Sequence, residues 1–269
     1  MVTYGSHRDS GKRLDDETEN DRLLSQTNNA PSTEDEAEFR VGHELGSLLH
    51  LSLPSVAVQF SLYFLFPLTA SVVGRKLGSE ALAGFALGSL VGNLSCLSVI
   101  VGALSAADTL LPRAYGAGDY PEMGLLAIRG VLACTILLVP LVLLLCLALD
   151  RLLSNLGQDP VAVTLATDWI VPYYILGVPA NMLFRVIQRF LVAQRRPWPP
   201  VYAGAFTSLC LHPWLVHCCV NQWGFRGSAV AISLSQWIML AILLFYLRIK
   251  HVHHPETWSG KRRRCVRCG

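Results

Sequence analysis

The residues of this 269-residue chain that could do chemistry are few, and they stand apart inside long apolar runs. Polar side chains are costly at membrane depth, so those that occur there are candidates for binding a solute or moving an ion. Six residues meet this condition: Gln59, Asn93, Ser98, Asp108, Asn181 and His212. Amide groups can contact a substrate or join two helices, and for Asn93 and Asn181 the sequence leaves both roles open.

His212 is the only ionisable residue near the middle of an apolar run. Histidine titrates near neutral pH and could carry a proton, although a structural histidine with satisfied hydrogen bonds is the favoured interpretation. Asp108 and Arg129 stand toward one end of their runs, and Asp168 stands toward the other. We expect Asp108 to cap a helix or to form an ion pair, with a role in a solute pathway as the alternative.

No combination of residues typical of an enzyme occurs in the sequence. There is no G-x-S-x-G, H-E-x-x-H or P-loop pattern and no pair of carboxylates suited to acid–base work. Cys265 and Cys268 form a lone C-x-x-C without the partners that a metal or redox site needs, and the other six cysteines fall in apolar runs. We therefore expect neither enzymatic activity nor a cofactor.

The composition indicates an integral membrane protein. Apolar residues make up 52% of the chain and charged residues only 15%, against about 25% in ordinary soluble domains. Eleven of the 19 acidic residues lie in residues 1–45, which leaves eight for the rest of the chain. So little charge cannot cover a water-facing surface, and the one dense basic run, Lys261–Arg264, is too short to indicate a nucleic-acid partner.

Six apolar segments are long enough to cross a bilayer, which takes about 20 helical residues. They are about 48–73, 81–111, 123–149, 161–184, 201–220 and 228–247. Continuous apolar runs of this length exclude barrel strands, which alternate with period two. The fold class is therefore all-α, with a disordered acidic tail over 1–45, six transmembrane helices within 46–248 and a basic tail over 249–269.

Loop charge gives the orientation of these helices. With the N-terminus inside, the inner connections and the C-terminus carry twelve Lys and Arg residues, including Arg185 and Arg189, and the outer connections carry four. The positive-inside rule then predicts that both termini are cytosolic. Glu19–Leu24 matches the acidic-dileucine sorting pattern, so a vacuolar or lysosomal membrane stands beside the plasma membrane as the expected location.

Small residues and prolines set the expected packing of the helices. Gly84, Gly88 and Gly92 recur every fourth residue, and Ser98, Gly102 and Ala106 repeat the spacing, which lets helix backbones approach closely. Prolines inside the apolar segments remove helical hydrogen bonds and can kink the helix: Pro54, Pro67, Pro140, Pro172 and Pro179.

Several linked motifs resemble one family, the multidrug and toxic compound extrusion (MATE) transporters. Asn93–Leu110 is similar, without gaps, to that family's N-x-x-x-x-S-x-x-x-G-x-x-x-A-x-[ED]-T-L run, and Ala114–Gly118 follows it as A-Y-G-A-G. The remaining matches, in the family's order, are Glu44–Pro54 with Gln59, Gly157–Asp159, Gly177–Ala180, Gln188–Gln194 and Gly224–Ala231. Pro112 and Arg113 depart from the usual Gly-Gln.

The resemblance covers about residues 44–260 and only the first of the family's two six-helix lobes. His254–Gly260 looks like the link to a seventh helix, and Lys261–Gly269 does not resemble the family, so a truncated half is expected. Family members exchange organic cations and drugs for H⁺ or Na⁺ along a path between the lobes. Their key acids lie in the second lobe or in the first helix, where Phe66–Ser71 has none here.

The resemblance thus implies the N-terminal lobe of a secondary antiporter, with the lipid bilayer, a small organic cation or xenobiotic, and a second lobe or a second copy as partners. The coupling ion, H⁺ or Na⁺, would take the place of a cofactor. Two alternatives stay open. One is a non-transporting scaffold or dominant partner that kept the lobe. The other is a lipid flippase of the same superfamily, which usually has more basic residues in its cavity.

Overall fold

The structure is a computed structural model that describes residues 33–169 and 173–250. The chain divides into two compact units, Met1–Ser52 and Leu53–Gly269. In the first unit the described residues are the beginning of α2 (Thr33–Leu77), so residues 33–45 of the expected disordered tail are helical. The segment is rich in Glu and Leu, which favour helix, and it continues a span that is already helical and needs no separate nucleation. The rest of the expected disordered tail, and the basic tail beyond residue 250, lie outside the described residues.

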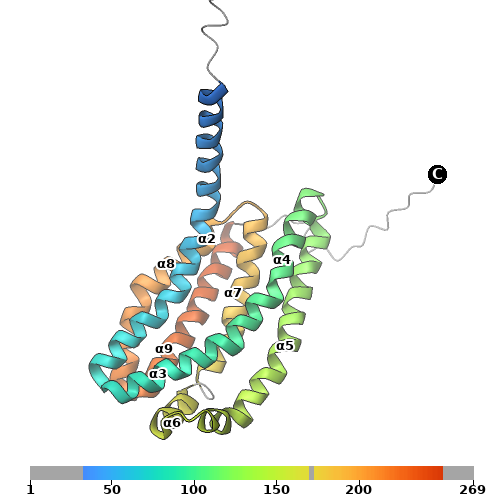
Figure 1. Ribbon diagram of the computed structural model, residues 1–269. Helices are drawn as coiled ribbons and strands as arrows, with labels where there is room; N and C mark the ends of the chain where they lie inside the picture. The colour runs from blue at the N-terminus through green and yellow to red at the C-terminus, as the bar shows by residue number, and fades with distance from the viewer. Residues whose placement is uncertain (1–32, 170–172, 251–269) are drawn as a thin grey trace, which may run out of the picture. The chain divides into compact units, whose positions relative to one another are not determined.

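The second unit is built from helices alone in its described residues, which confirms the all-α fold class. Figure 1 shows most of the long helices running side by side, with α6 at one end. After α2 come α3 (Ser79–Gly92), η1 (Asn93–Leu97), α4 (Ser98–Gly116), α5 (Tyr120–Asn155), α6 (Pro160–Trp169), α7 (Ile175–Ala193), α8 (Trp198–Ala205), η3 (Phe206–Leu211) and α9 (His212–Lys250). The two short elements η1 and η3 are π-helical turns.

Five stretches of the described chain are long and apolar enough to cross a membrane: Ser52–Leu77, Ser79–Gly116, Tyr120–Asn155, Ile175–Ala193 and Trp198–Ile249. The last is broken at Gly224, whose backbone has φ 58° and ψ −133°. The chain reverses direction at this break, as shown by Gly227, which lies directly against the backbone carbonyl of Cys219. Trp198–Ile249 therefore supplies two crossings, and the expected six transmembrane helices are confirmed.

The fourth crossing differs from the expected 161–184. It consists of α6 and α7, and Pro172 lies outside the described residues. Arg185 and Arg189 belong to α7 and not to the connection that follows it, which corrects the sequence analysis. A span was expected to end at its first arginine, but these arginines share one helix face with Asn181 at a spacing of four residues and stay inside the packed helices.

The glycines of α3 pack as predicted. A Cβ on Gly84 would lie 2.6 Å from Cβ of Leu165, one on Gly88 would lie 2.9 Å from the Trp169 ring, and one on Gly92 would lie 2.5 Å from the Tyr174 ring. The prediction for Gly102 is wrong, because no atom lies within 4 Å of its would-be Cβ. The same spacing thus marks a helix contact in α3, which packs against α6. In α4 it marks an open face at Gly102, because the described helices that contact α4 do not reach this position.

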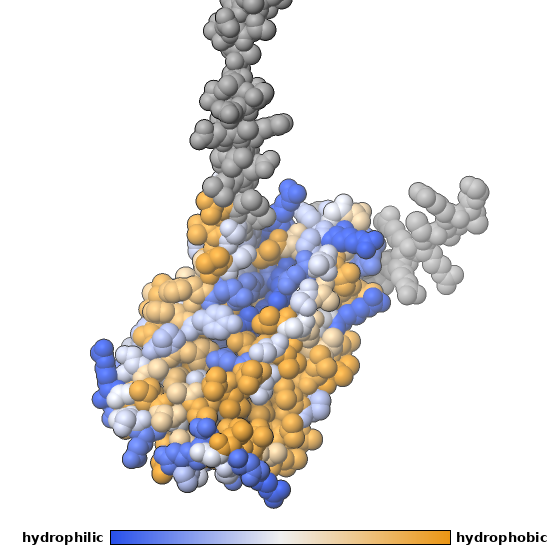
Figure 2. Space-filling view, viewed as in Figure 1, coloured by the Kyte–Doolittle hydropathy of each residue, from blue (hydrophilic) through white to orange (hydrophobic). Residues whose placement is uncertain are grey.

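Hydrophobic side chains cover much of the second unit's surface. Figure 2 shows a broad apolar area with hydrophilic residues gathered at its two ends. α5 is the least covered of the crossings, since only 17% of its most apolar window is buried. Such a surface is stable in lipid, where apolar side chains need no shielding from water.

Candidate functional site

A polar pocket opens between α2, α4 and α7. Its cavity measures about 210 Å³. The lining comes from one end of each membrane crossing. It consists of Ser55, Gln59, Ala107, Asp108, Pro112, Arg185, Gln188, Arg189, Val192 and Ala193. Three charged side chains among ten residues are unusual for the interior of a membrane bundle, where ionisable groups mark functional sites by default.

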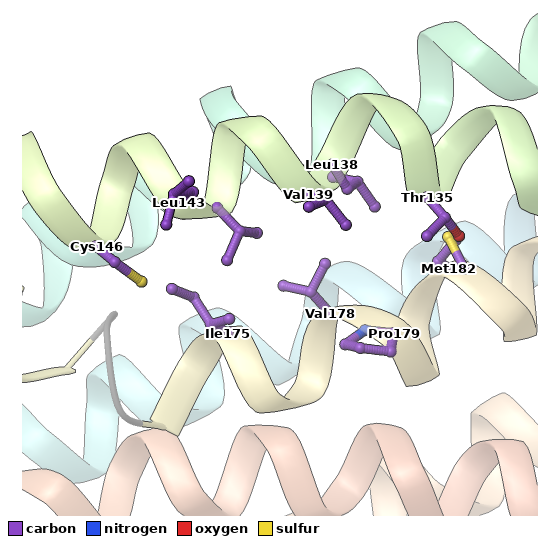
Figure 3. Close-up of a pocket in the computed structure, with 10 residues that line it drawn as sticks. Thr135, Leu138, Val139, Leu143, Cys146, Ile175, Val178, Pro179 and Met182 are labelled. Atoms are coloured by element: carbon purple, nitrogen blue, oxygen red, sulfur yellow. The ribbon is translucent and has the colours of Figure 1, made fainter.

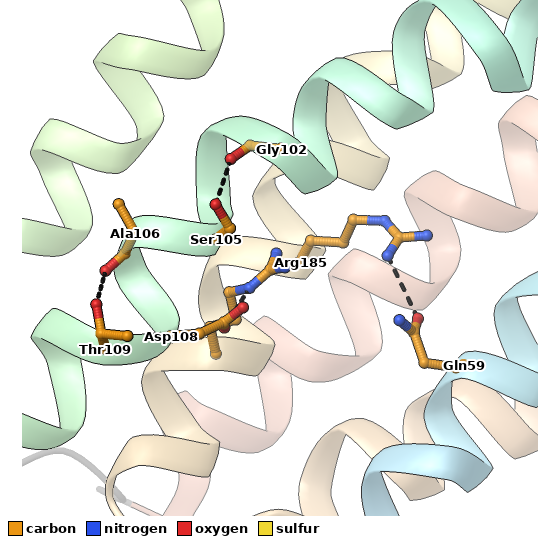
Figure 4. Close-up of polar contacts among 8 residues, drawn as sticks. Gln59, Gly102, Ser105, Ala106, Asp108, Thr109 and Arg185 are labelled. Carbon is orange, nitrogen blue, oxygen red and sulfur yellow. Dashed lines mark hydrogen bonds and ion pairs between the residues drawn. The ribbon is translucent and has the colours of Figure 1, made fainter.

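Arg185 is the most deeply placed of the charged residues in this pocket, with only 2% of its surface exposed. Its Nε donates to Asn181 Oδ1 at 2.8 Å, and its Nη1 donates to Gln59 Oε1 at 3.3 Å. Figure 4 shows the side chain reaching from α7 toward Gln59 on α2. Neutral groups therefore hold this cation in place.

Arg189 and Asp108 form an ion pair at the edge of the pocket. Arg189 Nε donates to Asp108 Oδ1 at 2.6 Å, and the two side chains are 17% and 53% exposed. The pair joins α7 to α4 and fulfils the expectation that Asp108 forms an ion pair. Ser105 and Thr109 of α4 add nothing to it, because their hydroxyls donate to the carbonyls of Gly102 and Ala106 in their own helix (Figure 4).

His212 lies in a separate group of buried polar side chains, here called the histidine cluster, with Thr69 and Ser235. Its Nδ1 lies 2.8 Å from Ser235 Oγ, and its Nε2 lies 2.9 Å from Thr69 Oγ1 and 3.2 Å from the Leu65 carbonyl. The Leu65 carbonyl can only accept, so Nε2 carries a proton in this arrangement. The side chain is fully buried, with both ring nitrogens bonded, as a structural histidine would be.

Asn93 and Ser98 are held by the π-helical turn η1. The backbone N–H of Ser98 donates to the Asn93 carbonyl and closes the turn, and the Ser98 hydroxyl donates to the same carbonyl at 3.2 Å. The Asn93 Oδ1 is buried and has no hydrogen-bond partner in the described part of the chain. A π-turn frees backbone groups and often marks a functional position, so Asn93 stays a candidate apart from the polar pocket.

A larger, apolar pocket lies between α5 and α7. Its cavity measures about 440 Å³, and its lining is almost entirely aliphatic: Thr135, Leu138, Val139, Val142, Leu143, Cys146, Ile175, Val178, Pro179 and Met182. Figure 3 shows the labelled side chains of α5 and α7 facing one another across the space. A cavity of this kind accepts apolar or aromatic groups and gives them no fixed orientation.

The structure thus brings three of the six predicted residues together, namely Gln59, Asp108 and Asn181. Arg185 and Arg189 were not predicted as site residues, because the charge pattern assigns them to a connection. Their spacing of four residues from Asn181 is the signal that would have put all three on one helix face. Residues 33–169 and 173–250 hold no group of three His, Cys, Asp or Glu side chains that could bind a metal ion.

Known proteins share this arrangement of helices. Residues 54–216 match the family model described as MatE. Multidrug and toxin extrusion protein 2 of Pongo abelii is 30% identical over 231 residues, which cover 84% of this chain and 38% of that protein. Protein DETOXIFICATION 3 of Arabidopsis thaliana is 31% identical over 231 residues, which cover 84% of this chain and 47% of that protein.

Solved structures agree with these sequence matches. The crystal structure of the eukaryotic MATE transporter AtDTX14 aligns with a TM-score of 0.71 and 27% identity, over 77% of this chain and 46% of that one. A MATE structure in the bent conformation aligns with a TM-score of 0.62 at 22% identity, over 76% and 45%, which shows the fold alone. The chain spans less than half the length of each of these relatives.

Proposed function

The chain belongs to the MatE family of transporters, and we propose that it forms one half of an antiporter that exports organic cations, drugs or toxic compounds in exchange for H⁺ or Na⁺. The observation that carries this proposal is the alignment of its six crossings with slightly less than half of a transporter structure. The names of its relatives, multidrug and toxin extrusion and DETOXIFICATION, support the substrate class.

In this proposal the chain supplies a substrate surface and not the coupling group. The apolar pocket between α5 and α7 suits the hydrocarbon body of a xenobiotic. Two candidate coupling groups of the chain, which lie elsewhere, are already engaged: Asp108 pairs with Arg189, and both ring nitrogens of His212 are bonded. Alternating access works by moving one repeat against another, so a facing half must provide the second wall and the coupling acid.

The test is transport by purified protein in liposomes. We expect no ethidium or tetraethylammonium efflux from the 269-residue chain alone under an imposed pH or sodium gradient, and gradient-dependent efflux once it is joined to the second half of DETOXIFICATION 3. If the joined protein inserts and folds but transports nothing, the antiporter proposal is wrong. That result would favour the alternative of a non-transporting scaffold. Efflux by the single chain that His212→Ala abolishes would make His212 the coupling site.

Orientation and location are part of the proposal. The ten Lys and Arg residues that remain on the inner side after Arg185 and Arg189 are assigned to α7 still outnumber the four on the outer side. This supports cytosolic termini in a plasma, vacuolar or lysosomal membrane. A membrane-impermeant thiol reagent, applied to intact cells expressing cysteine-free variants, should label a cysteine placed at Ser79 and not one at Ala117. The reverse pattern would overturn the orientation.

One observation favours a second candidate function. Arg185 and Arg189 both line the polar pocket, and the resemblance associates basic residues in the cavity with lipid flippases of the same superfamily. Fluorescent-lipid scrambling or flipping in the same liposomes separates this candidate from the antiporter.

A further inference from the structure

The polar pocket holds more positive charge than its described surroundings neutralise. Asp108 is the only carboxylate in the lining, and Arg189 already pairs with it at 2.6 Å. Arg185 forms no ion pair with any side chain that the structure describes, since the two ion pairs found there are Arg189–Asp108 and Arg226–Asp168. Its hydrogen-bond partners are the side-chain amides of Asn181 and Gln59.

Such partners orient a guanidinium without compensating its charge. An amide oxygen accepts a hydrogen bond, but a cation taken out of water without a counter-ion keeps an unfavourable desolvation cost. A guanidinium has five N–H donors, and the two bonds to Asn181 and Gln59 leave the others available. Arg185 is therefore held rigidly, nearly excluded from water, and still able to bind an acceptor that carries negative charge.

We propose that the polar pocket binds an oxyanion, a carboxylate or a phosphate group, on Arg185. The cavity of about 210 Å³ has room for such a group. The planar fork of arginine matches both anions with two parallel hydrogen bonds. Ser55 and Gln188 line the same cavity and supply neutral donors, while Arg189 offsets the charge of Asp108, so that the lining keeps the net positive charge of Arg185.

The anion can come from two sources with the same chemistry. One is a small soluble carboxylate or phosphate, and the other is the headgroup of an acidic lipid, since the pocket lies within a membrane-spanning bundle. Anion binding at this site does not depend on the proposed antiport. The positive charge of the pocket would repel an organic cation, so the site can bind an anion whether or not the chain takes part in cation export.

Binding to the full-length chain in an alkyl maltoside detergent tests the proposal, because this detergent contains no phosphate. Citrate and inorganic phosphate are titrated against chloride at equal ionic strength, and phosphatidic acid is titrated against phosphatidylcholine. We expect one of the anionic probes to raise the midpoint of thermal unfolding saturably. Arg185→Gln should weaken that binding at least about tenfold, as expected for the loss of charge-assisted hydrogen bonds, and Arg185→Lys should weaken it less. Arg151→Gln, an exposed arginine outside the pocket, should leave it unchanged.

The outcomes separate the sources and can refute the site. Saturable stabilisation by citrate or phosphate identifies a soluble anion, and stabilisation by phosphatidic acid alone identifies a lipid headgroup. If no anionic probe stabilises the unaltered chain more than chloride or phosphatidylcholine does, the pocket binds no oxyanion and the proposal is wrong. It is equally wrong if Arg185→Gln binds as well as the unaltered chain. Should that variant fail to fold, Arg189→Gln, which leaves the Asp108 carboxylate without its counter-charge in the lining, must also weaken binding.

Discussion

His212 and Arg185 are both buried basic side chains in the second unit, on the contacting helices α9 and α7, and their surroundings differ. The histidine cluster gives His212 a partner on each ring nitrogen, from α2 and from α9 itself. Arg185 has neutral partners, a full charge and an adjoining cavity of about 210 Å³. The first environment is complete within the chain, whereas the second leaves charge and space for something else.

The contrast indicates which of the two buried side chains is available to bind a ligand. A filled and fully bonded site resists change, because any shift breaks several contacts together. A held cation beside a cavity can gain an interaction without first losing one. The following variants test whether the histidine cluster is structural and the polar pocket is not.

His212→Ala should produce the largest loss of stability. Removing the ring leaves a cavity and deletes its hydrogen bonds, and we expect a loss of about 3 kcal/mol in the free energy of unfolding. Chemical denaturation in detergent measures it. His217→Ala, on the same helix and exposed, is the matched control and should change stability by less than about 0.5 kcal/mol. Similar losses for both would show that the histidine cluster is not structural.

Gly92→Ala should cost about 1–3 kcal/mol, the usual penalty for overpacking. Its new methyl group would lie 2.5 Å from the buried Tyr174 ring, so the helices must separate. Gly102→Ala meets nothing within 4 Å and should stabilise α4 by up to about 1 kcal/mol, because alanine favours helix. The unfolding midpoints of the two variants measure this difference. They test whether filled and open surroundings differ at glycine positions as they do at His212 and Arg185. A loss at Gly102 as large as that at Gly92 would contradict it.

Arg185→Met should change stability little, by about 1 kcal/mol in either direction, when no anion is present. Methionine is an unbranched apolar side chain that can fill part of the space of the arginine. Replacing a buried charge by an apolar group is often neutral or stabilising. The measurement is the same denaturation curve in an anion-poor buffer. A loss as large as that of His212→Ala would mean that Arg185 is structural, and the contrast between the two sites would disappear.

Arg189→Gln should have the smallest effect, a loss of less than about 1 kcal/mol, because its partner Asp108 is half exposed and exposed ion pairs contribute little. A double-mutant cycle with Asp108→Asn isolates the coupling between the two side chains. A coupling energy well above that limit would show that the edge of the polar pocket is as tightly built as the histidine cluster.

The sequence predicts the crossings well because long apolar runs have few alternatives. The six spans and the close contacts of the α3 glycines follow from composition and spacing, and the structural role of His212 stays a prediction. The sequence does not predict that Gly102 faces open space, since close approach depends on which helix packs opposite. The charge pattern also assigns Arg185 to a loop, because an arginine usually marks the end of a span. The hydrogen bonds to Asn181 and Gln59 that hold it inside the helices are visible only in the structure.

The break at Gly224 has a consequence for how the chain enters the bilayer during synthesis. The turn between the two crossings of Trp198–Ile249 is so tight that Gly227 touches the Cys219 backbone. Because so few residues connect the two crossings, they can pair as a hairpin as soon as both have been synthesised, before any distant helix is needed. We expect a tag or glycosylation site inserted after Gly224 to disturb this pairing as well as to report on topology.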